Sequence, residues 1–167
     1  MLQQESLNKS KNMRTSYEVI DALRKRGDHK CEHCGANISS IEHSLSLGLV
    51  NSLRKFATAI KKKKINEAHL QTECEFSFNE YNNFQKLGYF GLVAKKRGKS
   101  GYWVLTRNGG AFLRNELAIP KNVRTFRDFK IDESEKTVKI RDFYNDVYTD
   151  DYWQTTFEMR IEQGKLL

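Results

Sequence analysis

Residues 87–113 constrain the fold of this chain more than any other segment. An apolar run, Tyr89–Val93, leads into a basic stretch with two glycines, Lys95–Gly101, and then into a second apolar run, Tyr102–Leu105. Glycines in a short loop allow the chain to reverse, so the pattern predicts two strands joined at a basic tip. With a helix before and a helix after it, this order is typical of the wing end of a winged helix-turn-helix.

Three helices are predicted around this hairpin. The segment from Ser44 to Ile60 has apolar residues at helical spacing, which indicates one buried stripe. That stripe consists of Leu45, Leu49, Leu53, Phe56 and Ile60. A second helix, Phe78–Leu87, stops at Gly88 and would be the recognition helix of the fold. Its inner side is expected to hold Phe78, Tyr81, Phe84 and Leu87. Thr106 is expected to cap a third helix that buries Phe112 and Leu113.

The remaining segments are less regular. We expect a flexible arm over residues 1–14, a zinc-knuckle and winged-helix domain over 15–117, and an extension over 118–167 packed on it. Within the domain, a short helix opening at Thr15 is expected to stop at Gly27, a polar loop to span residues 28–43, and a short helix or turn to lie around Ile65–Leu70. Within the extension, Val123–Ile131 and Thr137–Phe143 are predicted to form a hairpin through an acidic turn, and 149–162 to form a helix. The fold class expected is therefore α+β.

Charge favours a polyanionic partner for one end of the chain. The formal net charge is +8, and residues 1–64 hold 13 Lys and Arg against 6 Asp and Glu, whereas residues 118–167 hold 9 against 10. Such asymmetry is typical of proteins that bind nucleic acid or another acidic surface through one face. Excess lysine that only maintains solubility is the alternative.

The first half of a metal site is predicted at Cys31-Glu-His-Cys34-Gly35. Two thiolates separated by two residues can chelate one tetrahedral zinc ion, and structural zinc takes four ligands. His69 and Cys74 would complete a Cys3His site, with His29, His33 and His43 as alternatives. Cys74 as a buried core residue is the competing interpretation.

A nucleic-acid surface is predicted on the second helix and the wing. Amide side chains can pair with adenine in the major groove, and wing cations can contact phosphates. The candidates are Asn79, Asn82, Asn83, Lys86, Lys96, Arg97 and Lys99. Glu80 on the same helix would repel phosphates, so a helix that only packs or contacts protein is the alternative.

These motifs resemble a small family of uncharacterised proteins from bacteriophages and mobile elements. The features that match are Cys31-Glu-His-Cys34-Gly35, Leu87-Gly-Tyr-Phe90-Gly-Leu-Val93, Gly101-Tyr-Trp103-Val-Leu-Thr106-Arg-Asn-Gly109-Gly-Ala-Phe112, and Pro120. Phe90 departs from the tryptophan usual in that family, and the match spans about residues 30–145. The resemblance implies a phage-encoded winged-helix protein with a zinc knuckle, and it implies no activity.

The function expected is therefore that of a phage-type DNA-binding regulator or accessory protein, acting on double-stranded DNA in the host cytoplasm. The alternative is a phage effector that binds and inhibits a host protein. No Gly-rich phosphate loop, His-Glu-x-x-His or Gly-x-Ser-x-Gly motif occurs in the sequence, so we expect no enzymatic activity. No apolar run approaches the ~20 residues that span a bilayer.

The metal prediction can be tested directly. Purified protein is expected to contain about one zinc ion per chain, and Cys31→Ser or Cys34→Ser to lower zinc content and melting temperature together, because metal binding contributes to folding free energy. Zinc content is measured by atomic emission and melting by calorimetry. Metal-free protein with unchanged melting would contradict the prediction. A full zinc content in Cys74→Ser would show that Cys74 is not a ligand and would favour the alternative histidines.

Overall fold

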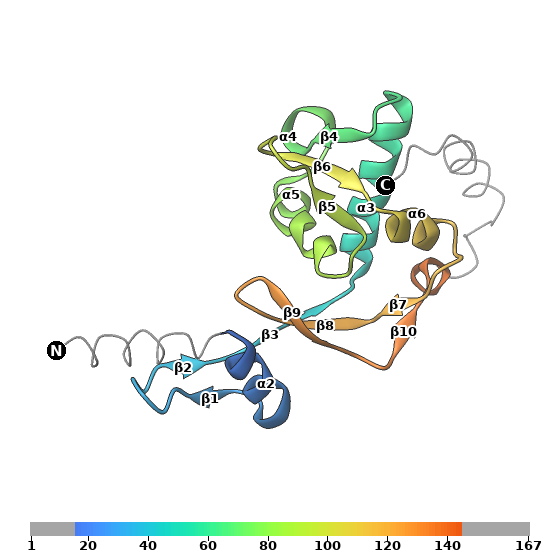
Figure 1. Ribbon diagram of the computed structural model, residues 1–167. Coiled ribbons are helices and arrows are strands. Elements are labelled where there is room, and N and C mark those ends of the chain that lie inside the picture. Colours follow the sequence, from blue (N-terminus) through green and yellow to red (C-terminus); the bar gives the residue numbers. More distant parts are fainter. Residues whose placement is uncertain (1–15, 145–167) are drawn as a thin grey trace. The chain divides into compact units, whose positions relative to one another are not determined.

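The computed structural model describes residues 16–144 and contains both helices and strands, which confirms the α+β class (Figure 1). These residues divide into two compact units. Unit 1 holds residues 16–42 and 124–132, and unit 2 holds residues 43–123 and 133–144. Each unit is described by itself. No helix of residues 16–144 is long and apolar enough to cross a membrane.

Unit 1 begins with helix α2 (Ser16–Arg26). The helix ends as predicted at Gly27, which has a φ of 73° and donates its N–H to Leu23 O at 3.0 Å. The predicted loop over residues 28–43 is wrong in part, because two-residue strands β1 (His29–Lys30) and β2 (Asn37–Ile38) pair within it. The cysteine motif lies in the reversal between these two strands.

The predicted hairpin of Val123–Ile131 with Thr137–Phe143 is wrong, because the chain already reverses within the first of these segments. Strands β8 (Asn122–Phe126) and β9 (Phe129–Glu133) are neighbours in a three-stranded sheet of order β3-β8-β9, where β3 is Ile41–Ser44. The chain reverses at Arg127 and Asp128, whose φ values are 47° and 67°. Two consecutive residues at positive φ match the twist of a tight hairpin, so the reversal falls here and not at the acidic stretch.

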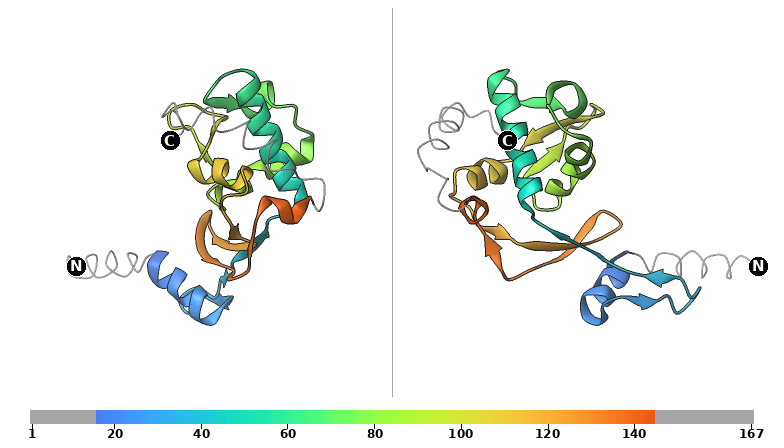
Figure 2. Two further views of the ribbon diagram at one scale, coloured as in Figure 1. Left: turned by 90° about the vertical axis from the view of Figure 1, so that its right-hand side faces the viewer. Right: turned by 180° about the vertical axis from the view of Figure 1, so that it is seen from behind.

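Unit 2 is built on helix α3 (Leu47–Lys62), which is capped by Ser46 through a hydrogen bond from Leu49 N–H to the Ser46 hydroxyl, 3.3 Å long. All five residues of the predicted apolar stripe are buried, and four of them lie on the helix, since Leu45 precedes the cap at Ser46 and the predicted start at Ser44 is wrong. The helix lies across one face of a small sheet, as the front and rear views show (Figures 1 and 2). Trp103 and Phe90 belong to the same hydrophobic cluster as the stripe.

The sheet of unit 2 has three strands in the order β4-β6-β5. Strand β4 (Glu67–His69) replaces the helix or turn predicted there, and the short helix α4 (Leu70–Glu73) follows it. Strand β6 (Tyr102–Leu105) matches its predicted limits. In the register, Ala68 pairs with Trp103 on one side of β6 and Lys95 pairs with Trp103 on the other.

The predicted first wing strand, Tyr89–Val93, is wrong except at Val93, because the strand begins there and continues to Lys95. Strand β5 covers Val93–Lys95, whereas residues 89–92 form a turn in which Gly91 has a φ of 72°. The Leu92 N–H donates to Leu87 O at 3.1 Å, and this bond holds the turn close to the preceding helix end. The hairpin itself, β5 with β6, forms as predicted.

Helix α5 (Phe78–Phe84) continues into a 3-10 turn, η1 (Gln85–Gly88), which ends at the predicted glycine. Ser77 and Glu80 form a capping box at its start. Phe84 and Leu87 are fully buried, as predicted. The expectation for Phe78 and Tyr81 is wrong, because their side chains are 80% and 38% exposed. The helix turns only one edge to the core, so the outer aromatic residues face solvent.

Helix α6 (Arg107–Leu113) starts at Thr106, whose hydroxyl accepts the Gly109 N–H at 3.0 Å and donates to Gly91 O at 2.6 Å. The predicted cap and the burial of Phe112 and Leu113 are confirmed. Strand β7 (Ile119–Pro120) then pairs with β10 (Thr137–Val138), and η2 (Ile140–Phe143) ends the described chain. The predicted arm, the Thr15 cap and the terminal helix lie outside the described residues, and the predicted domain limits stay predictions.

Gly109 is the position where packing leaves least room. A Cβ built on Gly109 would lie 2.1 Å from Leu92 O, whereas one on Gly110 would meet only the flexible Arg114 side chain at 3.3 Å. We expect Gly109→Ala to lower the free energy of unfolding by about 3 kcal/mol or more, because backbone must move. Gly110→Ala is the control and is expected to be neutral or slightly stabilising, since alanine favours helix. Urea unfolding measures both, and equal stability of the two variants would contradict this packing.

Candidate nucleic-acid interface

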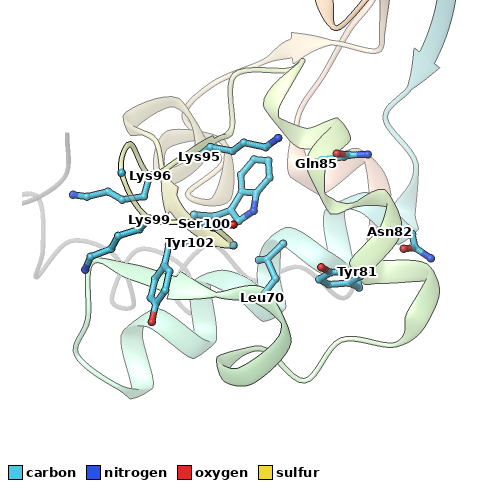
Figure 3. A pocket seen from close by; sticks show the side chains of 12 residues that line it. Leu70, Tyr81, Asn82, Gln85, Lys95, Lys96, Lys99, Ser100 and Tyr102 are labelled. Carbon is cyan, nitrogen blue, oxygen red and sulfur yellow. The ribbon is translucent and has the colours of Figure 1, made fainter.

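A groove of about 680 Å³ lies in unit 2 between helix α5 and the β5–β6 hairpin (Figure 3). Amide, aromatic and lysine side chains line it. The lining residues are Leu70, Tyr81, Asn82, Gln85, Lys95, Lys96, Gly98, Lys99, Ser100, Gly101, Tyr102 and Trp103. The groove therefore joins the two elements that the sequence singled out, the second helix and the wing.

The helix contributes fewer of the predicted residues than expected. Of the four candidates on it, Asn82 lines the groove, and Tyr81 and Gln85 line it in addition. Asn79, Asn83 and Lys86 are not among the lining residues. The Asn83 side-chain amide donates to Asn79 O at 2.8 Å, so this amide is already used along the helix.

The wing contributes three lysines to the groove, Lys95, Lys96 and Lys99, while Arg97 is exposed at the tip and does not line it. Lys95 Nζ lies 5.5 Å from the centre of the Trp103 ring, within range of a cation–π interaction. In Figure 3 the Lys95 side chain extends to the right, toward the side on which Gln85 lies. The Lys96 and Lys99 side chains extend to the left, away from that side.

Glu67 on β4 holds the two other wing lysines. Its carboxylate lies 3.2 Å from Lys96 Nζ and accepts a hydrogen bond from Lys99 Nζ. The Lys99 ammonium lowers the pKa of the Glu67 carboxyl group, and Glu67 in turn raises the pKa of Lys99. Both groups are therefore charged at neutral pH, and the single Glu67 carboxylate balances one of the four positive charges of the wing, which come from Lys95, Lys96, Arg97 and Lys99.

The wing is fixed to the same strand by close packing. Gly101, at a φ of 75°, approaches His69 so closely that a Cβ there would lie 2.4 Å from His69 Nε2. The His69 ring also meets the Tyr102 ring edge-on, with 5.2 Å between ring centres. This packing gives the predicted metal ligand His69 a structural role at the base of the wing.

Cys31 and Cys34 lie in a tight turn of unit 1. The Cys31 N–H donates to Ala36 O and the Gly35 N–H donates to Cys31 O, both at 2.8 Å, and Gly35 has a φ of 69°. Hydrogen bonds from the backbone N–H groups of Cys34 and His33, followed by one from the Cys34 thiol, lower the pKa of Cys31. A turn that gathers two thiols and favours a thiolate suits one half of a tetrahedral zinc site.

The predicted second pair has different surroundings. Cys74 in unit 2 is buried, and burial raises the pKa of its thiol to about 11. Metal binding requires the thiolate, so this environment opposes a ligand role and suits a core residue. Among residues 16–144, no three His, Cys, Asp or Glu side chains lie close enough together to hold a metal ion.

Several groove residues are not among the candidates predicted from the sequence. Tyr81 was expected on the inner side of its helix, since its spacing from Phe78 and Phe84 matches an apolar stripe. The sequence does point to Gln85 and Lys95, because Gln85 adjoins the predicted candidate Lys86 and Lys95 adjoins Lys96. No sequence signal places Glu67 at the wing. It lies 28 positions before Lys95, and only the β4–β6 pairing brings it there.

Comparisons of the chain with protein-family models, curated proteins and solved structures found no significant match. The resemblance to phage-encoded proteins therefore stays a prediction.

Proposed function

We propose that unit 2 is a winged helix-turn-helix and that it binds double-stranded DNA through the groove between α5 and the wing. In this proposal the protein is a regulator or accessory protein that acts by binding and has no catalytic role. The observation that carries the proposal is the groove, because it places amides of the second helix beside lysines of the wing.

The order of elements supports the winged-helix assignment. Helix α3, strand β4, helices α4 and α5, and strands β5 and β6 follow one another in the chain, and the sheet order is β4-β6-β5. A winged helix-turn-helix has this arrangement: three helices and a small sheet whose last two strands form the wing. α4 has only four residues, so the first part of the helix-turn-helix is short.

The chemistry of the groove supports a nucleic acid as the ligand. Asn82 and Gln85 carry amides that can pair with adenine edges, and Lys95 can contact a phosphate. Tyr81 is partly exposed and offers an apolar ring for contact with a base or sugar. Amides, a cation and an aromatic ring on one concave face are the groups that protein–DNA contacts use.

We also propose a structural zinc ion on Cys31 and Cys34. Support comes from the turn that gathers the two thiols and from the lowered pKa of Cys31. Zinc bound there would stabilise the reversal between β1 and β2. His69 and Cys74 remain the predicted completing pair, although the raised pKa of Cys74 argues against its thiolate.

A protein partner is the second candidate, and the exposure of Phe78 favours it. The first residue of α5 presents an aromatic ring that is 80% exposed, and Tyr81 lies one turn further along the same helix. Aromatic side chains are enriched in the centres of protein interfaces. An effector that inhibits a host protein would use this edge of α5.

The test of DNA binding uses Lys95→Ala and a labelled duplex of random sequence. We expect wild-type protein to bind with an affinity that falls as salt rises, and Lys95→Ala to weaken binding and flatten the salt slope by about 1 unit, because one phosphate contact is lost. Fluorescence anisotropy over a salt series gives both values.

The matched control is Lys61→Ala, which removes an equal charge from the exposed end of α3, outside the groove. Its salt slope should stay at the wild-type value. A wild-type protein that binds no duplex at low salt would contradict the proposal, and so would equal effects of the two variants. The first of these results would make the protein-binding candidate the better one.

A further inference from the structure

Two of the three lysines that line the groove, Lys96 and Lys99, have no part in the DNA contacts proposed above. Lys96 and Lys99 both approach the carboxylate of Glu67, with Lys96 Nζ 3.2 Å from Glu67 Oε2 and Lys99 Nζ hydrogen-bonded to Oε1. Each carboxylate oxygen thus has its own ammonium group. Lysine ammonium groups also bind phosphate as point charges, so the position between these two lysines suits a phosphate oxygen as well as a carboxylate oxygen.

Open space adjoins this carboxylate. A hollow of about 450 Å³ lies beside it, and its lining residues are Lys64, Ile65, Asn66, Glu67, Glu73, Lys96 and Tyr102. Lys64 is exposed and is, with Lys96, one of two cations in its wall, while Lys99 reaches Glu67 from outside the hollow. The Glu73 carboxylate in the same wall lies 3.9 Å from Lys63 Nζ. The hollow is large enough for a phosphate group and its sugar, and its two cations come from the wing and from the segment that follows α3.

The ion pairs around Glu67 are accessible to solvent. The Lys96 and Lys99 side chains are 46% and 55% exposed, and that of Glu67 is 20% exposed. Exposed ion pairs of this kind contribute little to stability and exchange readily with other ions. A phosphate that enters the hollow can therefore replace the carboxylate without any loss of buried structure.

We propose that Lys96, Lys99 and Lys64 form a phosphate-binding site that the Glu67 carboxylate occupies in the free protein, and that a nucleic-acid phosphate displaces Glu67 when the wing docks. The proposal rests on the proposed function, since the phosphate belongs to the nucleic acid bound in the groove. Glu67 then acts as an internal competitor that lowers affinity and makes the wing less attractive to anions in general.

Glu67→Gln tests this site, because glutamine keeps the shape of the side chain and removes its charge. We expect the variant to bind the random duplex about three- to tenfold more tightly at low salt, with a salt slope steeper by up to ~2 units, since two lysines become available to phosphates. Glu75→Gln is the matched control: it changes the net charge equally at an exposed residue that does not line the hollow.

A variant that lacks the lysines isolates the cause. In a Lys96→Ala, Lys99→Ala background, Glu67→Gln should have no more effect than Glu75→Gln. An effect that persists there, or a Glu67→Gln variant that binds no more tightly than Glu75→Gln, overturns the proposal. Unchanged thermal melting of Glu67→Gln establishes that the fold is intact.

Inorganic phosphate separates this site from the DNA-binding function. In a phosphate titration followed by NMR, the backbone amides of residues 96–102 should shift more in Glu67→Gln than in Glu75→Gln. Should no variant bind duplex while this difference is seen, the DNA-binding proposal fails and the phosphate site stands. Equal shifts in the two variants overturn the phosphate site whatever the duplex result.

Discussion

The packing around Phe84 holds the parts of unit 2 in register. This fully buried ring lies 5.0 Å from Phe56 of α3, 5.2 Å from Phe76 and 5.5 Å from Trp103 of β6, measured between ring centres. Aromatic rings at these separations and tilts attract one another beyond their burial. Because Phe84 ends α5 and Trp103 lies in β6, the return strand of the wing, one contact fixes both walls of the groove. The distance across the groove, from the amides of α5 to the lysines of the wing, thus depends on the packing of Phe84 in the hydrophobic core.

Balanced charge is the second feature that shapes this surface. The carboxylates nearest the interface are paired with lysines: Glu67 with Lys96 and Lys99, and Glu80 with Lys55, whose Nζ lies 2.8 Å from Glu80 Oε1. The Glu80 carboxylate, which would repel phosphates from α5, is thus compensated by Lys55. It also accepts a hydrogen bond from the Ser77 N–H and so helps to cap the helix. The net charge does not show which lysines a phosphate can reach, because some lysines are already paired with carboxylates.

The sequence predicted the parts of the fold whose signals are local. The stripe on α3, the cap at Thr106, the stop at Gly88 and the strand Tyr102–Leu105 each depend on residues within one or two turns of the chain, and all are confirmed. Strand β4 was missed because three residues carry too little periodicity, and pairing with β6 alone defines it.

The C-terminal hairpin was misplaced for a related reason. Asp128 is a typical turn residue but Arg127 is not one at positive φ, whereas the acidic stretch after Ile131 has several residues typical of a turn. A groove joins the two elements that the sequence singled out, but local spacing does not show which residues line it. The orientation of α5 places Asn82 and not Asn83 in the groove. Lys96 and Lys99 are paired with Glu67, which is distant in the sequence. Neither fact follows from local spacing.

The most direct test of the account is an NMR titration of isotopically labelled protein with a DNA duplex. The account predicts that the side-chain amide signals of Asn82 and Gln85 and the backbone signals of Lys95 and Gly98 shift together and saturably, since these residues line one groove. Shifts confined to the Phe78 edge of α5 or to the outer face of α3, or no shifts at low salt, would contradict it.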